Sequence, residues 1–275
     1  METYIQEKEV AKQIALRAGQ VILEYYSKNV SVTMKSGDEP VTEVDHAANN
    51  FIIENLQKAF PEDLIISEER ADDPKRLTAK RFWLVDPLDG TKEFLAHNGE
   101  FSVMIGLVEW GKPVVGAVFQ PTENRLWWGD RTKSFMLDNG VETTLQVSDR
   151  TDFQAMRAVV SRSHRSALLD QVFAKFNITN EIISGSGGIK IGLISQAKAE
   201  LMASASAGYK IWDICAPEAI LIGAGGIVTD FAGQPIDYQN KEQRAFNGIL
   251  ASNGKCHSDL VLGMKDLITL PFSKK

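Results

Sequence analysis

Residues 83–91 read WLVDPLDGT, an apolar run that leads directly into two aspartates. The apolar part is typical of a buried strand. Asp86 and Asp89 follow it three positions apart, in a segment that also holds a proline and a glycine. This spacing can direct both carboxylates and the carbonyl of Leu88 into one cleft, and such oxygen ligands are those that Mg²⁺ prefers. The alternative is an ordinary turn at a strand end, because Asp, Pro and Gly are common turn residues.

A second acidic pair, Glu68 and Glu69, follows another apolar run at residues 64–67. If the two predicted strands are neighbours that end together, Glu68 lies beside Asp86. Two carboxylates about 4 Å apart repel each other by roughly 4 kcal/mol at an effective dielectric of 20, so a cluster of them requires a cation. For the glutamates alone, a solvated charged loop remains the alternative.

A third acidic residue, Asp213, precedes an apolar helical stretch in the segment WDICAPEAI, residues 212–220. Pro217 is expected in the first turn of that helix, which makes Asp213 a candidate N-cap. A helix that starts at a sheet edge can also direct a metal ligand, so both roles are compatible.

Apolar periodicity predicts two helices at the start of the chain, residues 9–26 and 45–60, joined by a loop at 34–42. Short strands are predicted at 64–67 and 82–85, an antiparallel meander at 101–128 and a hairpin turn at 138–140. In the second half, strands are predicted at 158–161, 182–184, 199–202, 226–230 and 249–252, separated by helices. The expected fold class is therefore α/β and α+β, with one domain at residues 1–148 and a second at 149–275.

The composition excludes several classes of protein. The chain has 275 residues, 44% of them hydrophobic, and a net charge of −6, which offers no basic face for a nucleic acid polymer. No apolar run approaches the roughly 18 residues of a membrane span, and no signal peptide is recognised, so a cytoplasmic location without membrane insertion is expected. The two cysteines form neither a disulfide framework nor a zinc motif.

Taken in order, the Glu68–Glu69 pair, the DPLDGT string at 86–91 and the WD pair at 212–213 resemble the lithium-sensitive, Mg²⁺-dependent phosphatases related to inositol monophosphatase. The resemblance extends from residue 35 to about residue 252. It implies a layered αβαβα sandwich of the sugar-phosphatase type. Residues 92–94 and 212–221 are most similar to the 3'(2'),5'-bisphosphate nucleotidases, which convert 3'-phosphoadenosine 5'-phosphate into AMP and phosphate in sulfur metabolism.

The resemblance also implies two to three Mg²⁺ ions per site. Glu68, Asp86 and the Leu88 carbonyl would hold the first ion. Asp86, Asp89 and Asp213 would hold the second. A third, more weakly bound ion would be held by Glu68 and water.

The same resemblance implies that Asp45 and Thr91 activate the attacking water, with Asp45 accepting a hydrogen bond from the Thr91 hydroxyl. The amides of Gly90 and Thr91 would bind phosphate oxygens. In-line attack on a phosphate depends on charge neutralisation and positioning, which suits a site that lacks a nucleophilic Cys or Ser.

Substrate contacts are expected in the second half of the chain. His164 matches a nucleotide-binding position, although a cap or surface role is the alternative. The Gly-rich segment at 184–190 would bring the backbone at Ser186 close to AMP and Lys190 close to the 5'-phosphate. Ser186 departs from the nucleotidases, which tend to have Gly there. Ser206 stands where inositol phosphatases carry an inositol-contacting Glu, which favours the nucleotidase interpretation.

The substrate expected from this resemblance is 3'-phosphoadenosine 5'-phosphate, hydrolysed as a phosphomonoester with Mg²⁺. The alternatives within the same class of enzyme are inositol-1-phosphate and fructose-1,6-bisphosphate. A binding protein that retains the fold without activity is the alternative from another class. The Asp45 and Thr91 pair argues against it, because binding alone needs no water-activating pair. The sequence leaves the oligomeric state open between a monomer and a homodimer.

Overall fold

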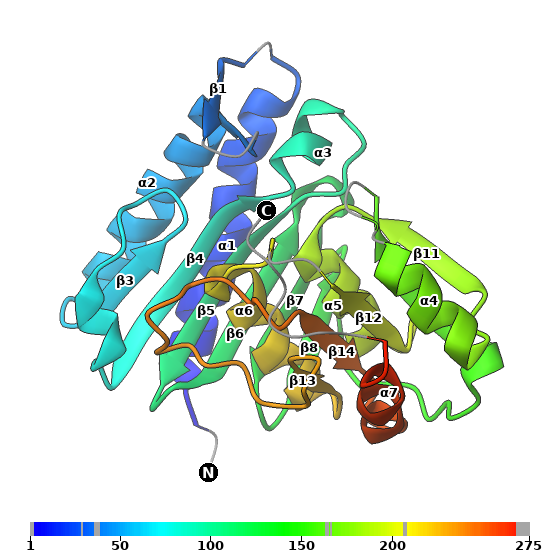
Figure 1. The fold of residues 1–275 in the computed structure, drawn as a ribbon. Helices are drawn as coiled ribbons and strands as arrows, with labels where there is room; N and C mark the ends of the chain where they lie inside the picture. The colour runs from blue at the N-terminus through cyan, green and yellow to red at the C-terminus, as the bar shows by residue number, and fades with distance from the viewer. Residues whose placement is uncertain are drawn as a thin grey trace.

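A computed structural model of the protein describes residues 3–28, 30–35, 39–162, 165, 167–205 and 208–267. These residues stack in alternating helical and sheet layers, with two helices outermost on one side and two on the other (Figure 1). The layered αβαβα arrangement predicted from the sequence is confirmed, as is the mixture of α+β and α/β organisation.

The larger sheet has, within the described residues, seven strands in the order β3-β4-β5-β6-β7-β8-β9. Their bounds are β3 (Leu64–Ser67), β4 (Arg81–Asp89), β5 (Ser102–Glu109), β6 (Lys112–Gln120), β7 (Arg125–Asp130), β8 (Ser134–Asp138) and β9 (Val141–Thr144). The pair β3 and β4 is parallel, and all other neighbours are antiparallel. Asn139 and Gly140 both have positive φ and form the predicted two-residue turn between β8 and β9.

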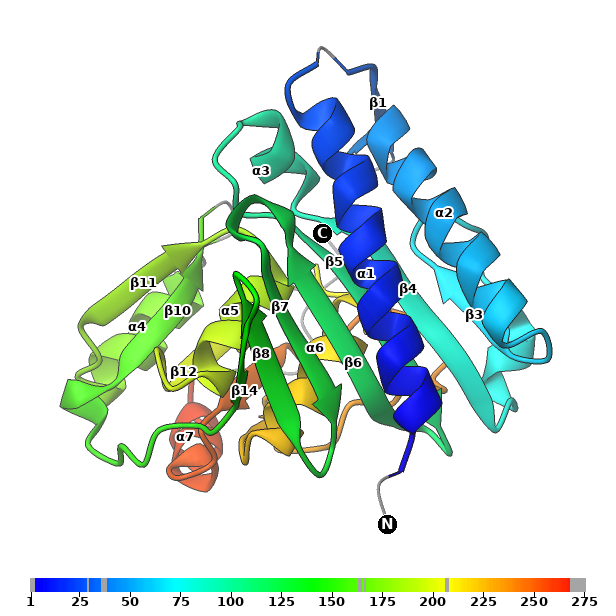
Figure 2. The same ribbon diagram turned by 180° about the vertical axis from the view of Figure 1, so that it is seen from behind.

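Two long helices, α1 (Ile5–Tyr26) and α2 (Glu43–Ala59), cover one face of this sheet (Figure 2). Gly19 lets α1 approach closely, because a Cβ there would lie 2.4 Å from the Phe119 ring. Both helices begin earlier than predicted. In α2 the reason is a capping box, in which Thr42 is the N-cap and Asp45 is the third helical residue.

Two further helices, α5 (Gly187–Ser195) and α6 (Ile211–Gly223), pack between the two sheets. Glycines in β5 and β6 allow α6 to approach. A Cβ on Gly116 would lie 2.1 Å from the Ala216 carbonyl oxygen, and one on Gly106 would lie 2.5 Å from the Cys215 sulfur. Pro217 lies inside α6 and not in its first turn as predicted, because the helix begins at Ile211.

The smaller sheet has five strands among the described residues, in the order β11-β10-β12-β14-β13. Their bounds are β10 (Arg157–Ser161), β11 (Asn180–Ser184), β12 (Leu201–Ser204), β13 (Ile227–Thr229) and β14 (Ile249–Ser252). The sheet is mixed, since β14 is antiparallel to β12 and β13. Its outer face is covered by α4 (Ala167–Phe176) and α7 (His257–Met264).

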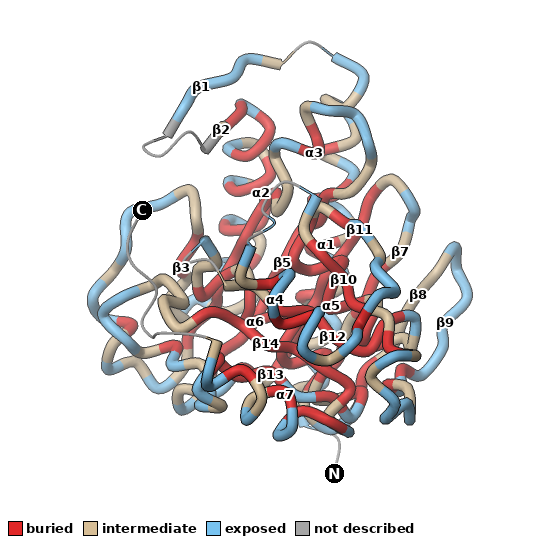
Figure 3. Tube along the Cα trace, turned by 45° about the vertical axis from the view of Figure 1, so that its right-hand side comes forward, coloured by how far each residue is buried: buried red, intermediate tan, exposed pale blue. Residues whose placement is uncertain are grey.

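Three further sequence predictions need correction. The segment 34–42 is not a plain loop: β1 (Val32–Lys35) pairs antiparallel with β2 (Glu39–Thr42), and Figure 3 shows β1 exposed at the margin of the molecule. The β-branched residues of these strands explain the pairing. β12 begins two residues later than predicted. Residues 230–248 form no helix between β13 and β14, because Gly, Pro and Asn recur there.

Along the sequence, the strands of the seven-stranded sheet end before residue 148 and those of the five-stranded sheet begin after residue 149. The domain boundary expected between residues 148 and 149 stays a prediction. Among the described residues, no helix combines the length and apolar character that crossing a membrane requires.

Candidate active site

Strand pairing brings the first two acidic residues together. β3 and β4 run parallel, and Ser67 is paired with Val85. The next residue of each strand's chain, Glu68 and Asp86, therefore lies beside the other. The amide of Glu68 donates to the Val85 carbonyl at 3.1 Å, which extends the pairing by one residue. β4 itself continues to Asp89 with a register shift after Asp86, so the predicted turn is an irregular strand end.

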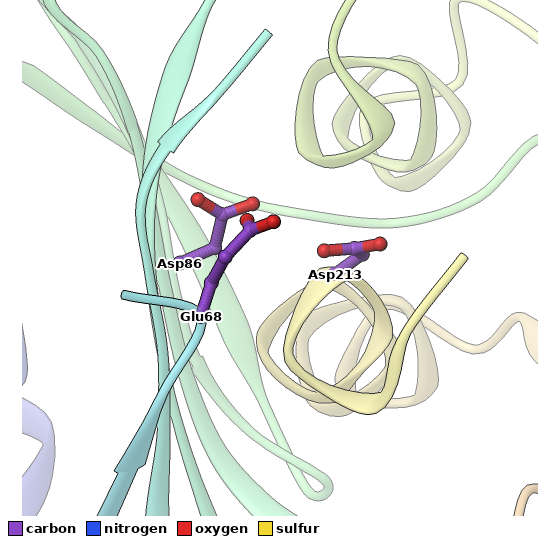
Figure 4. A group of neighbouring side chains, drawn as sticks. All are labelled: Glu68, Asp86 and Asp213. Carbon is purple, nitrogen blue, oxygen red and sulfur yellow. The ribbon is translucent and has the colours of Figure 1, made fainter. Parts of the chain in front are cut away.

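The third acidic residue arrives from the helix layer. Asp213, in the first turn of α6, faces Glu68 and Asp86 across the space between sheet and helix (Figure 4). One carboxylate oxygen from each of the three residues lies within 4.8 Å of the others. Asp213 is not the N-cap, as predicted, but the third helical residue. Its Oδ2 accepts from the amide of Lys210, the N-cap, at 2.8 Å.

Burial and like charge raise the pKa values of Asp86 and Asp213. The pKa of Asp86 lies well above its usual value because the carboxyl is buried and faces Glu68, Asp89 and Asp213. The pKa of Asp213 is raised in the same way, first by burial and then by Glu68 and Asp89. The neighbouring cation is Lys210, whose Nζ lies 2.8 Å from Glu68 Oε1. Oxygen ligands that repel one another at this range suit a divalent cation.

Asp89 lies beside this cluster but is held differently. It is outside the group of three carboxylates that approach within 4.8 Å. Its Oδ2 accepts hydrogen bonds from the hydroxyl of Ser186 and, at 3.1 Å, from the amide of Gly188 at the start of α5. Burial raises the pKa of Asp89, while Ser186, Lys190 and Gly188 oppose that shift.

The predicted water-activating pair is in hydrogen-bond contact. Thr91 Oγ1 donates to Asp45 Oδ1 at 3.0 Å, and its alternative acceptor is the Leu88 carbonyl at 3.3 Å. Asp45 is buried, and its other oxygen accepts from both the amide and the hydroxyl of Thr42, at 2.7 and 2.6 Å. Gly90 adopts φ 96° before the short helix α3 (Thr91–Leu95), a conformation that favours glycine.

A cavity of about 210 Å³ connects these groups. The site residues that line it are Glu68, Asp86, Leu88, Asp89, Gly90, Thr91, Lys190 and Asp213. Lys190 is buried, and its Nζ donates to the Gly185 carbonyl at 3.0 Å. Ser186 does not line the cavity. It is completely buried behind Asp89.

Two predicted positions, His164 and Ser206, lie outside the described residues. Conversely, the sequence interpretation missed Lys210 as a site residue, although the cavity lining includes it. Its position three residues before Asp213, at the start of an apolar helix, was the available signal. Tyr209 was missed as well; its ring centroid lies 5.8 Å from the Lys190 ammonium.

Comparison with known proteins identifies the family of the chain. The model of the inositol monophosphatase family matches residues 6–261. The 3'(2'),5'-bisphosphate nucleotidase CysQ of Escherichia coli (strain K12) is 35% identical over 235 residues, covering 84% of this chain and 93% of that protein. The protein of the same name from Buchnera aphidicola is 34% identical over 246 residues, or 87% of this chain and 91% of the relative.

Solved structures share the fold. CysQ from Bacteroides thetaiotaomicron matches with a TM-score of 0.78 and 28% identity, covering 92% of this chain and 98% of that chain. The suhB protein of Bartonella henselae matches with a TM-score of 0.82 at 23% identity, covering 96% and 100%, which is a likeness of fold alone.

The fold and these matches define a hydrolase of the phosphatase class, which acts on small phosphorylated substrates. The chain belongs to the inositol monophosphatase family, whose members are generally metal-dependent. The cluster of Glu68, Asp86 and Asp213 fits a metal ion by its donor atoms and its mutual repulsion.

Proposed function

We propose that this enzyme removes the 3'-phosphate of 3'-phosphoadenosine 5'-phosphate and releases AMP and inorganic phosphate. The observation that carries the proposal is the cavity lined by both the acidic cluster and Thr91, whose hydroxyl donates to Asp45. The substrate class is supported by the nucleotidases named CysQ, which match most of the chain at 34–35% identity.

Mg²⁺ is the metal proposed for the acidic cluster. Glu68, Asp86 and the Leu88 carbonyl would hold one ion. Asp86, Asp89 and Asp213 would hold a second. A third, more weakly bound ion would be held by Glu68. Bound Mg²⁺ would neutralise the phosphate and lower the pKa of the attacking water.

The residues of the chain supply the proton path. The Thr91 proton points to Asp45, so the lone pairs of Oγ1 can accept a hydrogen bond from water in the cavity. As the water attacks, Thr91 takes its proton and passes its own to Asp45. The two hydrogen bonds from Thr42 hold the Asp45 carboxylate in place for this step.

Phosphate recognition is assigned to residues that line the same cavity. The amides of Gly90 and Thr91 would bind the oxygens of the transferred phosphate, and the Lys190 ammonium would attract the 5'-phosphate. Negative charge on the six acidic residues that line the cavity would otherwise repel the substrate, so these groups and the metal would act together.

The test is a comparison of initial rates. 3'-Phosphoadenosine 5'-phosphate, inositol-1-phosphate and fructose-1,6-bisphosphate are supplied at equal concentration with Mg²⁺, and phosphate release is measured. The proposal expects the nucleotide to be fastest. A clear preference for inositol-1-phosphate would keep the phosphatase and overturn the substrate assignment. Metal binding without phosphate release from any of the three would support the non-catalytic alternative.

We also propose that Li⁺ inhibits the enzyme and that it takes part in sulfur metabolism, because the family that it resembles has these properties. A cytoplasmic location is part of the same proposal.

A further inference from the structure

The hydroxyl of Ser186 stands at the junction of two sheets and the α5 helix. Ser186 is the N-cap of α5, and its side chain is completely buried. Its Oγ contacts three groups from separate parts of the chain. These are Asp89 Oδ2 at the end of β4, Ser102 Oγ at 2.9 Å in β5, and the amide of Ile189 at 3.2 Å in α5.

The directions of these hydrogen bonds follow from counting protons. A serine hydroxyl has one proton to donate and two lone pairs that accept. The Ile189 amide can only donate, and an ionised Asp89 carboxylate can only accept. The single proton of Ser186 therefore goes to Asp89, and Ser102 must donate to Ser186. The result is a directed chain from Ser102 through Ser186 to Asp89.

This chain constrains the carboxylate of Asp89. Both Ser186 and the Gly188 amide donate to Oδ2, so the two bonds hold that oxygen against the start of α5. Asp89 also lines the cavity, and Oδ1 is the oxygen that neither of these donors engages. Asp89 in β4 is paired with Ser102 in β5, so the first and last residues of the hydrogen-bonded chain are neighbours in the sheet.

We propose that Ser186 is a positioning residue for the metal site, which holds Asp89 so that it presents Oδ1 to a divalent cation. The inference rests on the proposed function, because it takes Asp89 as a ligand. It replaces the substrate contact expected for Ser186 from the sequence. Hydrogen-bond partners of this kind typically change metal affinity or activity about 10-fold to 100-fold when removed.

The decisive variant is Ser186→Gly, which removes the hydroxyl. Glycine is itself a tolerated N-cap, so the start of the helix is retained. Ser186→Ala is a second variant, and Ser186→Thr restores a hydroxyl. The matched control is Ser195→Ala at the other end of α5, which also removes a buried hydroxyl, one that donates to the Ile191 carbonyl at 3.0 Å.

The measurement is calorimetric titration of Mg²⁺ into each metal-free protein, with thermal unfolding recorded alongside. Mg²⁺ affinity is expected to fall about 10-fold or more in Ser186→Gly and Ser186→Ala, and to recover in Ser186→Thr. Ser195→Ala should keep the wild-type affinity. At saturating Mg²⁺, the KM for the nucleotide should change less than about twofold, because Ser186 does not line the cavity.

Wild-type affinity in Ser186→Gly, with only the unfolding temperature lowered, would overturn the inference and leave Ser186 as a helix cap. That result would not touch the proposed function. A wild-type protein that binds no Mg²⁺ would instead overturn the metal-dependent function, and this inference with it.

Discussion

The ammonium nitrogen of Lys210 lies 2.8 Å from Oε1 of Glu68, so the acidic cluster contains a cation of its own. Both side chains are largely buried. Lys210 is also the N-cap of α6, and its amide holds Asp213. One residue therefore contacts two of the three clustered carboxylates, one through its side chain and one through its backbone.

Replacing Lys210 with Met is expected to have opposite effects on the metal-free and metal-bound proteins. Loss of the ammonium leaves Glu68 less compensated, so the protein in EDTA should become less stable by about 1 kcal/mol. Mg²⁺ should bind several-fold more tightly, because it no longer competes with the lysine. Unfolding in EDTA and calorimetric titration measure the two effects. Lys80→Met, at a lysine over the exposed Trp110 ring, controls for the change in net charge. Weaker Mg²⁺ binding in Lys210→Met would contradict this explanation.

Asp86→Asn should abolish activity and yet stabilise the metal-free protein. The substitution removes one of three carboxylates that lie within 4.8 Å of one another. At an effective dielectric of about 20, relief of the repulsion from one ionised neighbour contributes about 3 kcal/mol. The rate of phosphate release should fall by several orders of magnitude because one of the proposed metal ligands would be lost. Asp266→Asn, at an exposed position, should change neither quantity. Unaltered turnover in Asp86→Asn would remove Asp86 from the site.

Thr91→Val tests the proton path. Valine keeps the shape of threonine but cannot relay a proton between water and Asp45, so kcat should fall about 100-fold to 10,000-fold with little change in KM. Thr91→Ser keeps the hydroxyl and should retain most of the activity. Steady-state kinetics on both variants provide the measurement. Equal rates for the Val and Ser variants would show that the hydroxyl takes no part.

Glu218 predicts a pH dependence of stability. It is buried in α6 and accepts a hydrogen bond from the Tyr238 hydroxyl at 2.6 Å, and burial raises its pKa from 4.5 to about 7. The folded state therefore holds this proton to higher pH than the unfolded state does. The stabilisation that protonated Glu218 contributes is fully present below pH 4.5 and is lost as the pH rises through about 7. The free energy of unfolding should fall by up to about 3 kcal/mol over this range.

Glu218→Gln should remove this loss. Denaturant unfolding in EDTA at pH 5 and pH 7.5 should show a smaller decrease for the variant than for the wild type. Glu123→Gln, at an exposed position, should behave as the wild type. Parallel decreases in all three proteins would exclude Glu218 as a source of the pH dependence.

Local patterns predicted the sheet and the nearness of Glu68 and Asp86, because each residue directly follows an apolar run of the sequence and the two strands are neighbours. The roles of Lys210 and Ser186 depend on how α5 and α6 pack against the sheet. No local pattern encodes that packing. The β1–β2 hairpin was missed because its turn composition obscures two short strands. Asp213 was taken for an N-cap since it precedes the apolar run, whereas the helix begins earlier, after Lys210.

The most direct test of the central claim is phosphate release from 3'-phosphoadenosine 5'-phosphate by protein stripped with EDTA and then resupplied with Mg²⁺. We predict no release from the stripped protein and full recovery when Mg²⁺ returns, with no recovery in Asp86→Asn. Release that continues at the same rate without a divalent cation would contradict the assignment of Glu68, Asp86 and Asp213 as a catalytic metal centre.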